Sequence, residues 1–379
     1  MKRGAPAAGS VLTWITALVF TVAIGAGITQ TRILWGPTAL EHSRDVRRLV
    51  FAQTYQAARA VYAPAADDRR APVVLLGNSR IWLAARPSYL EPVLAHDLPD
   101  RPLRVDNLGI FGADIRDVEP LGRHVDALAP AMVVIAVGTS DLVPDPTIPW
   151  PTLAARVFDL GWRDGPVPPI GAAEHLDRWA RTAWPLFRFR EMARAAIEDR
   201  VVPASDTEAF PDHFTTTAAI FAYMHGPRGA EVEAAYQTWR RQPTLANFTA
   251  YLQIGSQLHL ALVRRRAQDP AIPDATSPGV RQLEALLTGL ASRHVPAMVV
   301  VMPENPLLAQ DAANAFHQPG FSDAVAGLIT ATAARAGTTV VDARDWMPAD
   351  QFLDFDHLLP ELSGFQTRLG AEITHALRS

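Results

Sequence analysis

Four short segments of this sequence carry residue types that together suit serine-based acyl chemistry. They read GNSR at Gly77–Arg80, NLGIFG at Asn107–Gly112, VGTSD at Val137–Asp141 and FLDFDHLLPELSGFQTRLG at Phe352–Gly370. Such chemistry needs a nucleophile, a base that takes its proton, an acid that orients the base, and donors for the oxyanion. The four segments offer a residue for each of these roles.

Ser79, His357 and Asp354 are the candidates for the nucleophile, the base and the orienting acid. Asp354 stands three residues before His357, and one turn of chain can bring its carboxylate to the imidazole. Asp356 competes for the orienting role, although it adjoins His357 and would need a tighter geometry. These residues predict a Ser–His–Asp triad assembled from the two ends of the chain.

The oxyanion donors are expected from three of the segments. The backbone N–H groups of Ser79 and Gly112 are two candidates, and Gly112 has no Cβ to keep a substrate from its backbone. The hydroxyl group of Ser140 is the third candidate, because a serine can donate one hydrogen bond.

Four further residues, Arg80, Asn107, Asp141 and Asn305, are candidates to bind substrate. Arg80 either binds an anionic group or pairs with a carboxylate, and Asp141 is expected to hold its loop rather than to react. Asn305 lies in the segment MPENP, which follows another apolar run. No metal or other cofactor is predicted, because five other histidines lack metal-ligand spacing. These five are His124, His213, His225, His294 and His317.

Five apolar runs must form the sheet that positions these segments. They are continuous rather than alternating, which is typical of strands buried on both faces. Helical stretches between the runs indicate βαβ units and a doubly wound, flavodoxin-like parallel sheet of five strands. Ligands bind at the carboxyl ends of the strands in such sheets, where the polar segments lie. The runs are Val73–Leu76, Leu103–Asn107, Met132–Val137, Ala297–Met302 and Thr338–Val341.

A long interval between the third and fourth runs breaks the regular alternation of strands and helices. Residues 142–278 exceed any ordinary crossover connection, so we expect a large helical insertion beside the sheet edge. Within it, helical patterns cover His175–Arg200 and Glu231–Gln268, and Pro243 interrupts the second. A helix is also expected at Thr38–Tyr62, and a last helix near Pro360.

The N-terminal region predicts a membrane anchor. Residues 11–29 are uncharged and long enough to span a bilayer, between a cytoplasmic segment at 1–10 and a juxtamembrane helix and loop at 30–70. A cleaved signal peptide is the alternative, because small residues at Gly25–Gly27 could form a cleavage site. Basic residues lie on both sides of the apolar stretch, so their distribution does not fix its orientation.

Composition excludes several classes of site and partner. The chain is 49% hydrophobic, which suits a globular domain, and its net charge of −4 argues against a nucleic-acid partner. It has no cysteine, so disulfides, thiolate metal sites and cysteine nucleophiles are excluded.

The four segments resemble the blocks of the SGNH (GDSL-like) hydrolase superfamily. LLGNSR is similar to its serine block, NLGIFG to its glycine block, VGTSDL to its asparagine block, and DFDHL to its Asp-x-x-His block. The similarity spans Val73–Gly370 apart from the insertion, within a domain expected at 71–379. It implies the triad roles given above. One position departs from the pattern, because Ser140 stands where the family has an asparagine that donates to the oxyanion.

The Gly-x-Ser-Arg form and the N-terminal anchor resemble a subset that works beside membrane-bound O-acyltransferases on cell-envelope polymers. This resemblance implies an inner-membrane protein with its catalytic domain in the periplasm, acting on a polysaccharide or a small acyl ester. Acyl transfer is the expected reaction. An esterase shares the first half-reaction, and a non-catalytic glycan-binding partner of the acyltransferase is the third possibility.

Overall fold

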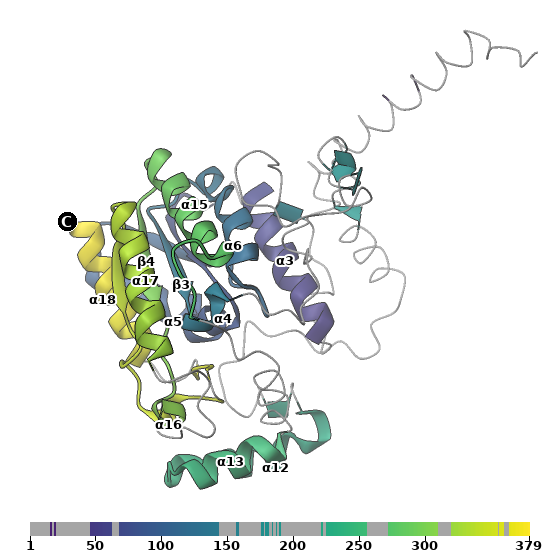
Figure 1. Cartoon of the computed structure of the whole chain (residues 1–379), viewed down its shortest axis with the longest axis vertical. Helices are drawn as coiled ribbons and strands as arrows, with labels where there is room; N and C mark the ends of the chain where they lie inside the picture. The colour runs from purple at the N-terminus through teal and green to yellow at the C-terminus, as the bar shows by residue number, and fades with distance from the viewer. Residues whose placement is uncertain are drawn as a thin grey trace, which may run out of the picture.

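The computed structural model of this chain is an α/β fold built on one five-stranded parallel sheet (Figure 1). It describes residues 46–62, 68–143, 225–255, 272–309, 320–354, 356–359 and 364–379, with isolated residues elsewhere. The spatial order is β2-β1-β3-β4-β5, the order of flavodoxin-like sheets. All five predicted strands are confirmed, with ends that move by at most two residues. They are β1 Ala71–Leu76, β2 Leu103–Asn107, β3 Met132–Val137, β4 Ala297–Val301 and β5 Thr339–Asp342.

The continuous apolar runs are explained by burial on both faces of the sheet. In β1, Val73 and Leu75 join one hydrophobic cluster, while Val74 and Leu76 join the other. All six residues of β3, the central strand, are buried. Because successive side chains point to opposite faces, a strand covered on both sides needs apolar residues at every position.

Helices supply the two covering layers. One hydrophobic cluster holds residues of α4 (Ser79–Ala84), α5 (Pro87–Asp97) and α18 (Gly364–Arg378). The other holds residues of α3 (Val46–Tyr62), α6 (Ile115–Gly122), α15 (Pro278–Ser292) and α17 (Phe321–Arg335). The sheet is therefore wound on both faces, and its carboxyl edge stays available for polar loops.

The last helix, α18, packs against the first βα unit of the sheet. Gln366 Nε2 donates to the carbonyl of Ala84 at 2.7 Å. Gly370 lies so close to α5 that a Cβ there would be 2.5 Å from a methyl carbon of Val93. The C-terminus thus covers the end of α4, the helix that begins at Ser79.

The described part of the long interval after β3 is mostly helical. α12 (Gly229–Arg241) and α13 (Leu245–Ile254) lie at the bottom of Figure 1, with the predicted break at Pro243 between them. Their aromatic side chains pack into the same cluster as α18, and Trp239 stacks on Tyr251 with ring planes 6° apart. Much of the remainder of the predicted 142–278 insertion, including most of 175–200, lies outside the described residues.

The starts of two expected helices lie outside the described residues. α3 is described over Val46–Tyr62, and residues 38–45 are not among the described ones. α18 is described over Gly364–Arg378, and residues 360–363, which include the expected start at Pro360, lie outside the described part as well. Apart from Thr16 and Val19, the expected anchor at 11–29 also lies outside the described residues. Among the residues that are described, no helix has both the length and the apolar character needed to cross a membrane.

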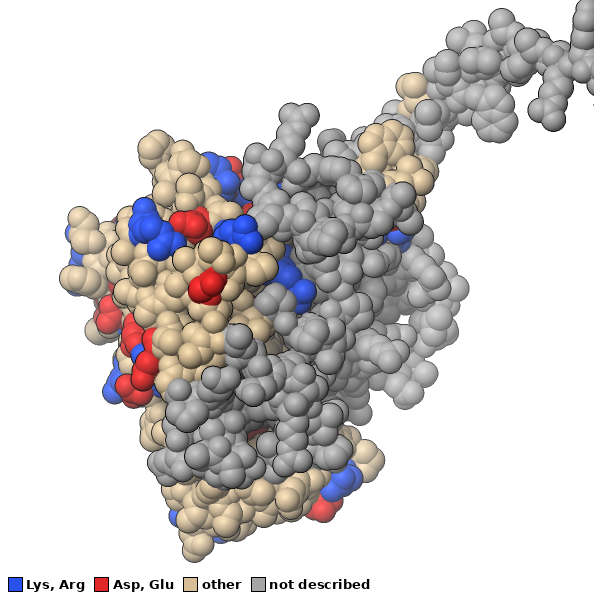
Figure 2. All heavy atoms as spheres, viewed as in Figure 1, with Lys and Arg blue, Asp and Glu red and all other residues tan. Residues whose placement is uncertain are grey.

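Acidic and basic side chains alternate on the described surface in Figure 2. One salt bridge of the described residues joins Arg335 Nε and Glu284 Oε1, which are 3.0 Å apart. The described part of the face in Figure 2 shows no extended region of one charge.

Candidate active site

The two residues before Ser79 fix the conformation of the turn that carries it. Gly77 has a φ of +152°, and a Cβ there would lie 2.7 Å from the carbonyl oxygen of Ala136. Asn78 caps α4, because its side-chain oxygen accepts from the Arg80 N–H at 3.0 Å. Ser79 is the first residue of α4 and is 8% exposed. Its backbone N–H stands where a helix has no internal acceptor.

Ser79, His357 and Asp354 form one hydrogen-bonded chain. His357 Nε2 is 2.8 Å from Ser79 Oγ. His357 Nδ1 lies 2.9 and 3.0 Å from the two carboxylate oxygens of Asp354. Because Nδ1 faces carboxylates, it carries a proton and donates it, and in the neutral ring Nε2 accepts from the serine hydroxyl. This is the arrangement that lets an imidazole remove the proton of a serine.

The loop between β5 and α18 folds around the carboxylate of Asp354. Asp354 Oδ1 accepts from the backbone N–H groups of Asp356 at 3.0 Å and of His357 at 2.9 Å. The Leu353 N–H donates to the His357 carbonyl at 2.7 Å and closes the loop. Asp354 is 3% exposed, so its charge is satisfied almost entirely by these donors and by the imidazole.

Two residues from other parts of the chain donate hydrogen bonds to backbone carbonyls of this loop. Asn305, predicted as a substrate contact, is buried and donates from Nδ2 to the Asp354 carbonyl at 3.2 Å. Tyr251 of α13 donates its hydroxyl to the Leu353 carbonyl at 2.5 Å. Burial also raises the pKa of Tyr251 well above its usual value, so the hydroxyl keeps its proton. Tyr251 thus ties α13, and with it the helical pair α12–α13, to the loop that holds His357.

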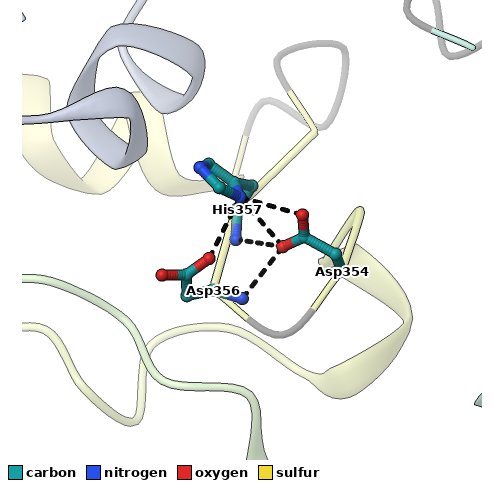
Figure 3. Close-up of side chains that lie close together, drawn as sticks. All are labelled: Asp354, Asp356 and His357. Carbon is teal, nitrogen blue, oxygen red and sulfur yellow. Dashed lines mark hydrogen bonds and ion pairs between the residues drawn. The ribbon is translucent and has the colours of Figure 1, made fainter. Parts of the chain in front are cut away.

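Asp356 lies on the other side of His357, as Figure 3 shows. Its Oδ1 is 3.0 Å from His357 Nδ1, an ion-pair contact, whereas the hydrogen bonds of Nδ1 go to Asp354. Its Oδ2 accepts from Nε of Arg80 and lies 2.8 Å from Nη2 of the same guanidinium. Of the two roles open to Arg80, the structure favours pairing with a carboxylate.

The guanidinium of Arg80 is enclosed by the loop after β3. Nη2 donates to Ser140 Oγ at 2.9 Å, and Nη1 would lie 1.7 Å from a Cβ at Gly138. Only glycine at position 138 leaves room for this side chain, which is 9% exposed as a whole residue. Ser140 Oγ therefore accepts a hydrogen bond from a cation and donates a long one, at 3.5 Å, to Asp141 Oδ1.

The charges in this cluster shift one another's pKa values. Burial lowers the pKa of His357, but the carboxylates of Asp354 and Asp356 outweigh burial and raise it from 6.5 to about 10. Burial raises the pKa of Asp356, but Arg80 and His357 hold it far below its usual value. Burial lowers the pKa of Arg80 as well, but Asp356, Asp141 and Glu304 together outweigh burial and raise it. The free site thus favours a protonated imidazole.

The loop after β2 runs beside the serine turn and brings Gly112 to the site. The Ile110 N–H donates to the Gly77 carbonyl at 3.1 Å. Gly109 permits this approach, because a Cβ there would be 2.9 Å from the carbonyl oxygen of Asn78. Gly112 itself has a φ of +72°, with no atom within 4 Å of a hypothetical Cβ. Its backbone is open to an incoming molecule.

Phe111, beside Gly112, links this loop to the imidazole and to α3. Its ring is parallel to that of His357, with centroids 6.3 Å apart. Its N–H donates to Oε1 of the buried Gln53 at 2.5 Å. With the Phe111 N–H turned toward α3, the N–H of Gly112 is the next donor along the chain.

Asp141 holds its loop, as expected. Its carboxylate accepts from the Gly138 N–H at 2.7 Å and from Asn78 Nδ2 at 3.0 Å, joining the β3 loop to the serine turn. Burial raises the pKa of Asp141 to about 6, although Arg80 lowers it. Asn107, another predicted substrate contact, donates from Nδ2 to the carbonyls of Ile81 and Ala85 at 3.1 and 2.8 Å. Its amide is engaged within the protein.

Asp354, Asp356 and His357 also bring three potential metal-ligand atoms within 4.8 Å of one another. Each of these side chains already has a partner. Both carboxylates contact Nδ1 of the imidazole, Nε2 faces Ser79, and Arg80 binds Asp356. A cation here would have to displace a guanidinium and a proton, so the donor set suits proton chemistry better than a metal.

The site also contains residues that the sequence did not single out. Gln53 and Tyr251 act across distances of 58 and 102 residues along the chain, which no local pattern reveals. Asn78 was detectable, because an asparagine directly before a short helix is a common N-cap.

Comparisons with known proteins add no assignment. Neither protein-family models nor curated proteins match this chain.

Proposed function

We propose that this protein is a serine acyl-transfer enzyme of the SGNH type, with Ser79 as its nucleophile. The observation that supports this most directly is the chain from Ser79 Oγ through His357 to Asp354, with contacts of 2.8 and 2.9 Å. Two loops from opposite ends of the domain contribute to it, the turn after β1 and the loop between β5 and α18. Chance assembly of a buried serine, imidazole and carboxylate in this order is improbable.

In the proposed reaction, Ser79 Oγ attacks the carbonyl carbon of an ester. His357 Nε2 takes the hydroxyl proton, and the carbonyl oxygen becomes an oxyanion. The N–H groups of Ser79 and Gly112 stabilise that oxygen, with the Ser140 hydroxyl as a third donor. When the intermediate collapses, the bond to the leaving alcohol breaks, and His357 returns the proton to that alcohol. An acyl group then remains on Ser79.

The second half-reaction determines the product. If a sugar hydroxyl gives its proton to His357 and attacks the acyl group, the protein is an O-acyltransferase; if water does so, it is an esterase. We favour transfer to an envelope or exported polysaccharide outside the cytoplasm, because the apolar segment at 11–29 suits an anchor and the sequence blocks resemble a subset with that activity. A membrane-bound O-acyltransferase is the partner that this resemblance implies.

One observation favours a second candidate, a glycan-binding partner without catalytic activity. The imidazole lies between two carboxylates, which favours its protonated form, and a protonated ring cannot act as a base. The replacement of the family asparagine by Ser140 points the same way.

Labelling by a fluorophosphonate separates the two candidates, because that reagent modifies only an activated serine. We expect wild-type protein to be labelled and Ser79→Ala and His357→Gln to be unlabelled. Mass spectrometry after incubation with acetyl and longer acyl esters should then show an acyl adduct on the Ser79 peptide. Absence of both adducts from folded wild-type protein would favour the binding protein.

A further inference from the structure

His357 differs from an ordinary triad histidine in having two carboxylates at Nδ1. Asp354 forms both hydrogen bonds, at 2.9 and 3.0 Å, and its own position is fixed by two backbone N–H groups. Asp356 adds a second negative charge 3.0 Å from the same nitrogen. A second unopposed carboxylate would hold the proton on the imidazole and prevent it from acting as a base.

Arg80 opposes that second charge. Its Nε and Nη2 both lie 2.8 Å from the same oxygen, Oδ2 of Asp356, which is the oxygen that turns away from His357. An arginine keeps its charge at every pH that the protein tolerates. The contact is enclosed, with side-chain exposures of 10% for Arg80 and 19% for Asp356, so solvent screens it poorly.

The formal charges show what this pairing achieves. With a neutral imidazole, Asp354, Asp356 and Arg80 sum to −1, and with a protonated imidazole the group sums to zero. A triad with one carboxylate has the same two values. We propose that Arg80 is a positioning residue that neutralises Asp356, so that His357 works with the net charge of a one-carboxylate triad. This inference rests on the proposed acyl-transfer function.

Other charged and titratable groups face the pair from neighbouring elements. Asp141, after β3, and Glu304, after β4, both interact electrostatically with Arg80. Tyr251 of α13 faces the Asp354 side of the loop, and its hydroxyl stays neutral. The Phe111 ring covers one face of the imidazole. None of these groups contacts Nδ1 of His357 among the described residues, so Asp356 remains the charge that Arg80 directly offsets.

The test measures the fluorophosphonate labelling rate of the full-length protein against pH. The rate falls in acid as His357 becomes protonated, and the midpoint reports the apparent pKa of the base. We expect Arg80→Gln to move this midpoint upward by about one pH unit and Asp356→Asn to move it downward by about one unit. The double variant, in which neither charge is present, should return close to the wild-type midpoint. Arg80→Lys should shift it less than half as far as Arg80→Gln.

The results separate this inference from the function on which it rests. If wild-type protein is never labelled, the proposed function fails. If it is labelled but both single variants shift in the same direction, or neither shifts, the charge-neutralising role of Arg80 is wrong. If a single variant does not fold, the double variant and Arg80→Lys still test the inference. Neither of them leaves a buried charge without a partner, so both should fold. A double variant whose midpoint stays a full unit from that of wild type would overturn the inference.

Discussion

A single methyl group at Gly138 should dislodge Arg80. A Cβ at this position would lie 1.7 Å from Nη1 and 2.6 Å from Cζ of the guanidinium. To reach an ordinary contact of about 3.5 Å, the guanidinium must retreat by roughly 2 Å. The bonds to Asp356, now 2.8 Å long, would then exceed hydrogen-bonding distance. The backbone does not oppose the substitution, because Gly138 has φ −83° and ψ 156°, which alanine adopts readily.

The expected loss of stability follows from the enclosure of this ion pair. Removing one partner of a fully buried pair costs about 3 to 5 kcal/mol. Here the partner is displaced rather than removed, and the pair is partly exposed, so we expect Gly138→Ala to lower the free energy of unfolding by about 2 to 3 kcal/mol. Denaturant unfolding followed by circular dichroism measures this difference.

Gly327→Ala is the matched control. Gly327 lies in α17, is exposed, and has no atom within 4 Å of a hypothetical Cβ. Alanine in a helix interior is favoured over glycine by about 0.8 to 1 kcal/mol, so this variant should be slightly more stable than wild type. If Gly138→Ala were as stable as Gly327→Ala, the packing of Arg80 against residue 138 would be refuted.

Three further predictions concern the site and its supports. Ser140→Ala should lower kcat by about tenfold to several hundredfold with little change in KM, and Ser140→Asn should preserve or raise kcat. Steady-state kinetics measure both effects. If both variants reacted at the wild-type rate, the third oxyanion donor would lie elsewhere. Tyr251→Phe leaves the buried Leu353 carbonyl without its donor, so it should lower the free energy of unfolding by about 1 to 3 kcal/mol. Denaturant unfolding measures this loss, and an unchanged midpoint would contradict the contact. Because the pKa of His357 is raised from 6.5 to about 10, the stability it contributes is present below pH 6.5 and is lost as the pH rises toward 10. Between pH 6.5 and 10, the free energy of unfolding of wild-type protein should therefore fall by on the order of a few kcal/mol relative to that of His357→Gln. If the two proteins gave parallel curves of stability against pH, the pKa of His357 would not be raised.

The sheet was predictable because its strands are covered on both faces. Burial on both sides demands apolar residues at every position of a strand such as Met132–Val137, and that demand is visible in the sequence. The Asp354–His357 contact was predictable for a related reason, since three residues fit one turn. Both features depend on local spacing.

Contacts between distant side chains were not predictable in this way. The sequence left Arg80 with two roles, because its partner Asp356 lies 276 residues away and only the folded sheet brings them together. Tyr251 offered no hint of its bond to Leu353, because aromatic residues in a helix usually serve packing. The hydrogen bonds from Asn107 to α4 and its C-cap were not predictable either, because an asparagine at the end of a strand is equally common in a turn and in a ligand site.

The separation of 278 residues between Ser79 and His357 has a consequence for the newly made protein. A ribosome adds about 5 to 20 residues per second, so Ser79 precedes His357 by roughly 15 to 55 seconds of synthesis. α18 emerges later still, and it must return to α4 and α5 at the beginning of the domain. Such long sequence separations slow folding, because much of the chain must be ordered before these contacts can form. Nascent chains that end before residue 357 therefore carry the proposed nucleophile without its proposed base, and under this proposal Ser79 stays unreactive until nearly the whole chain has been made.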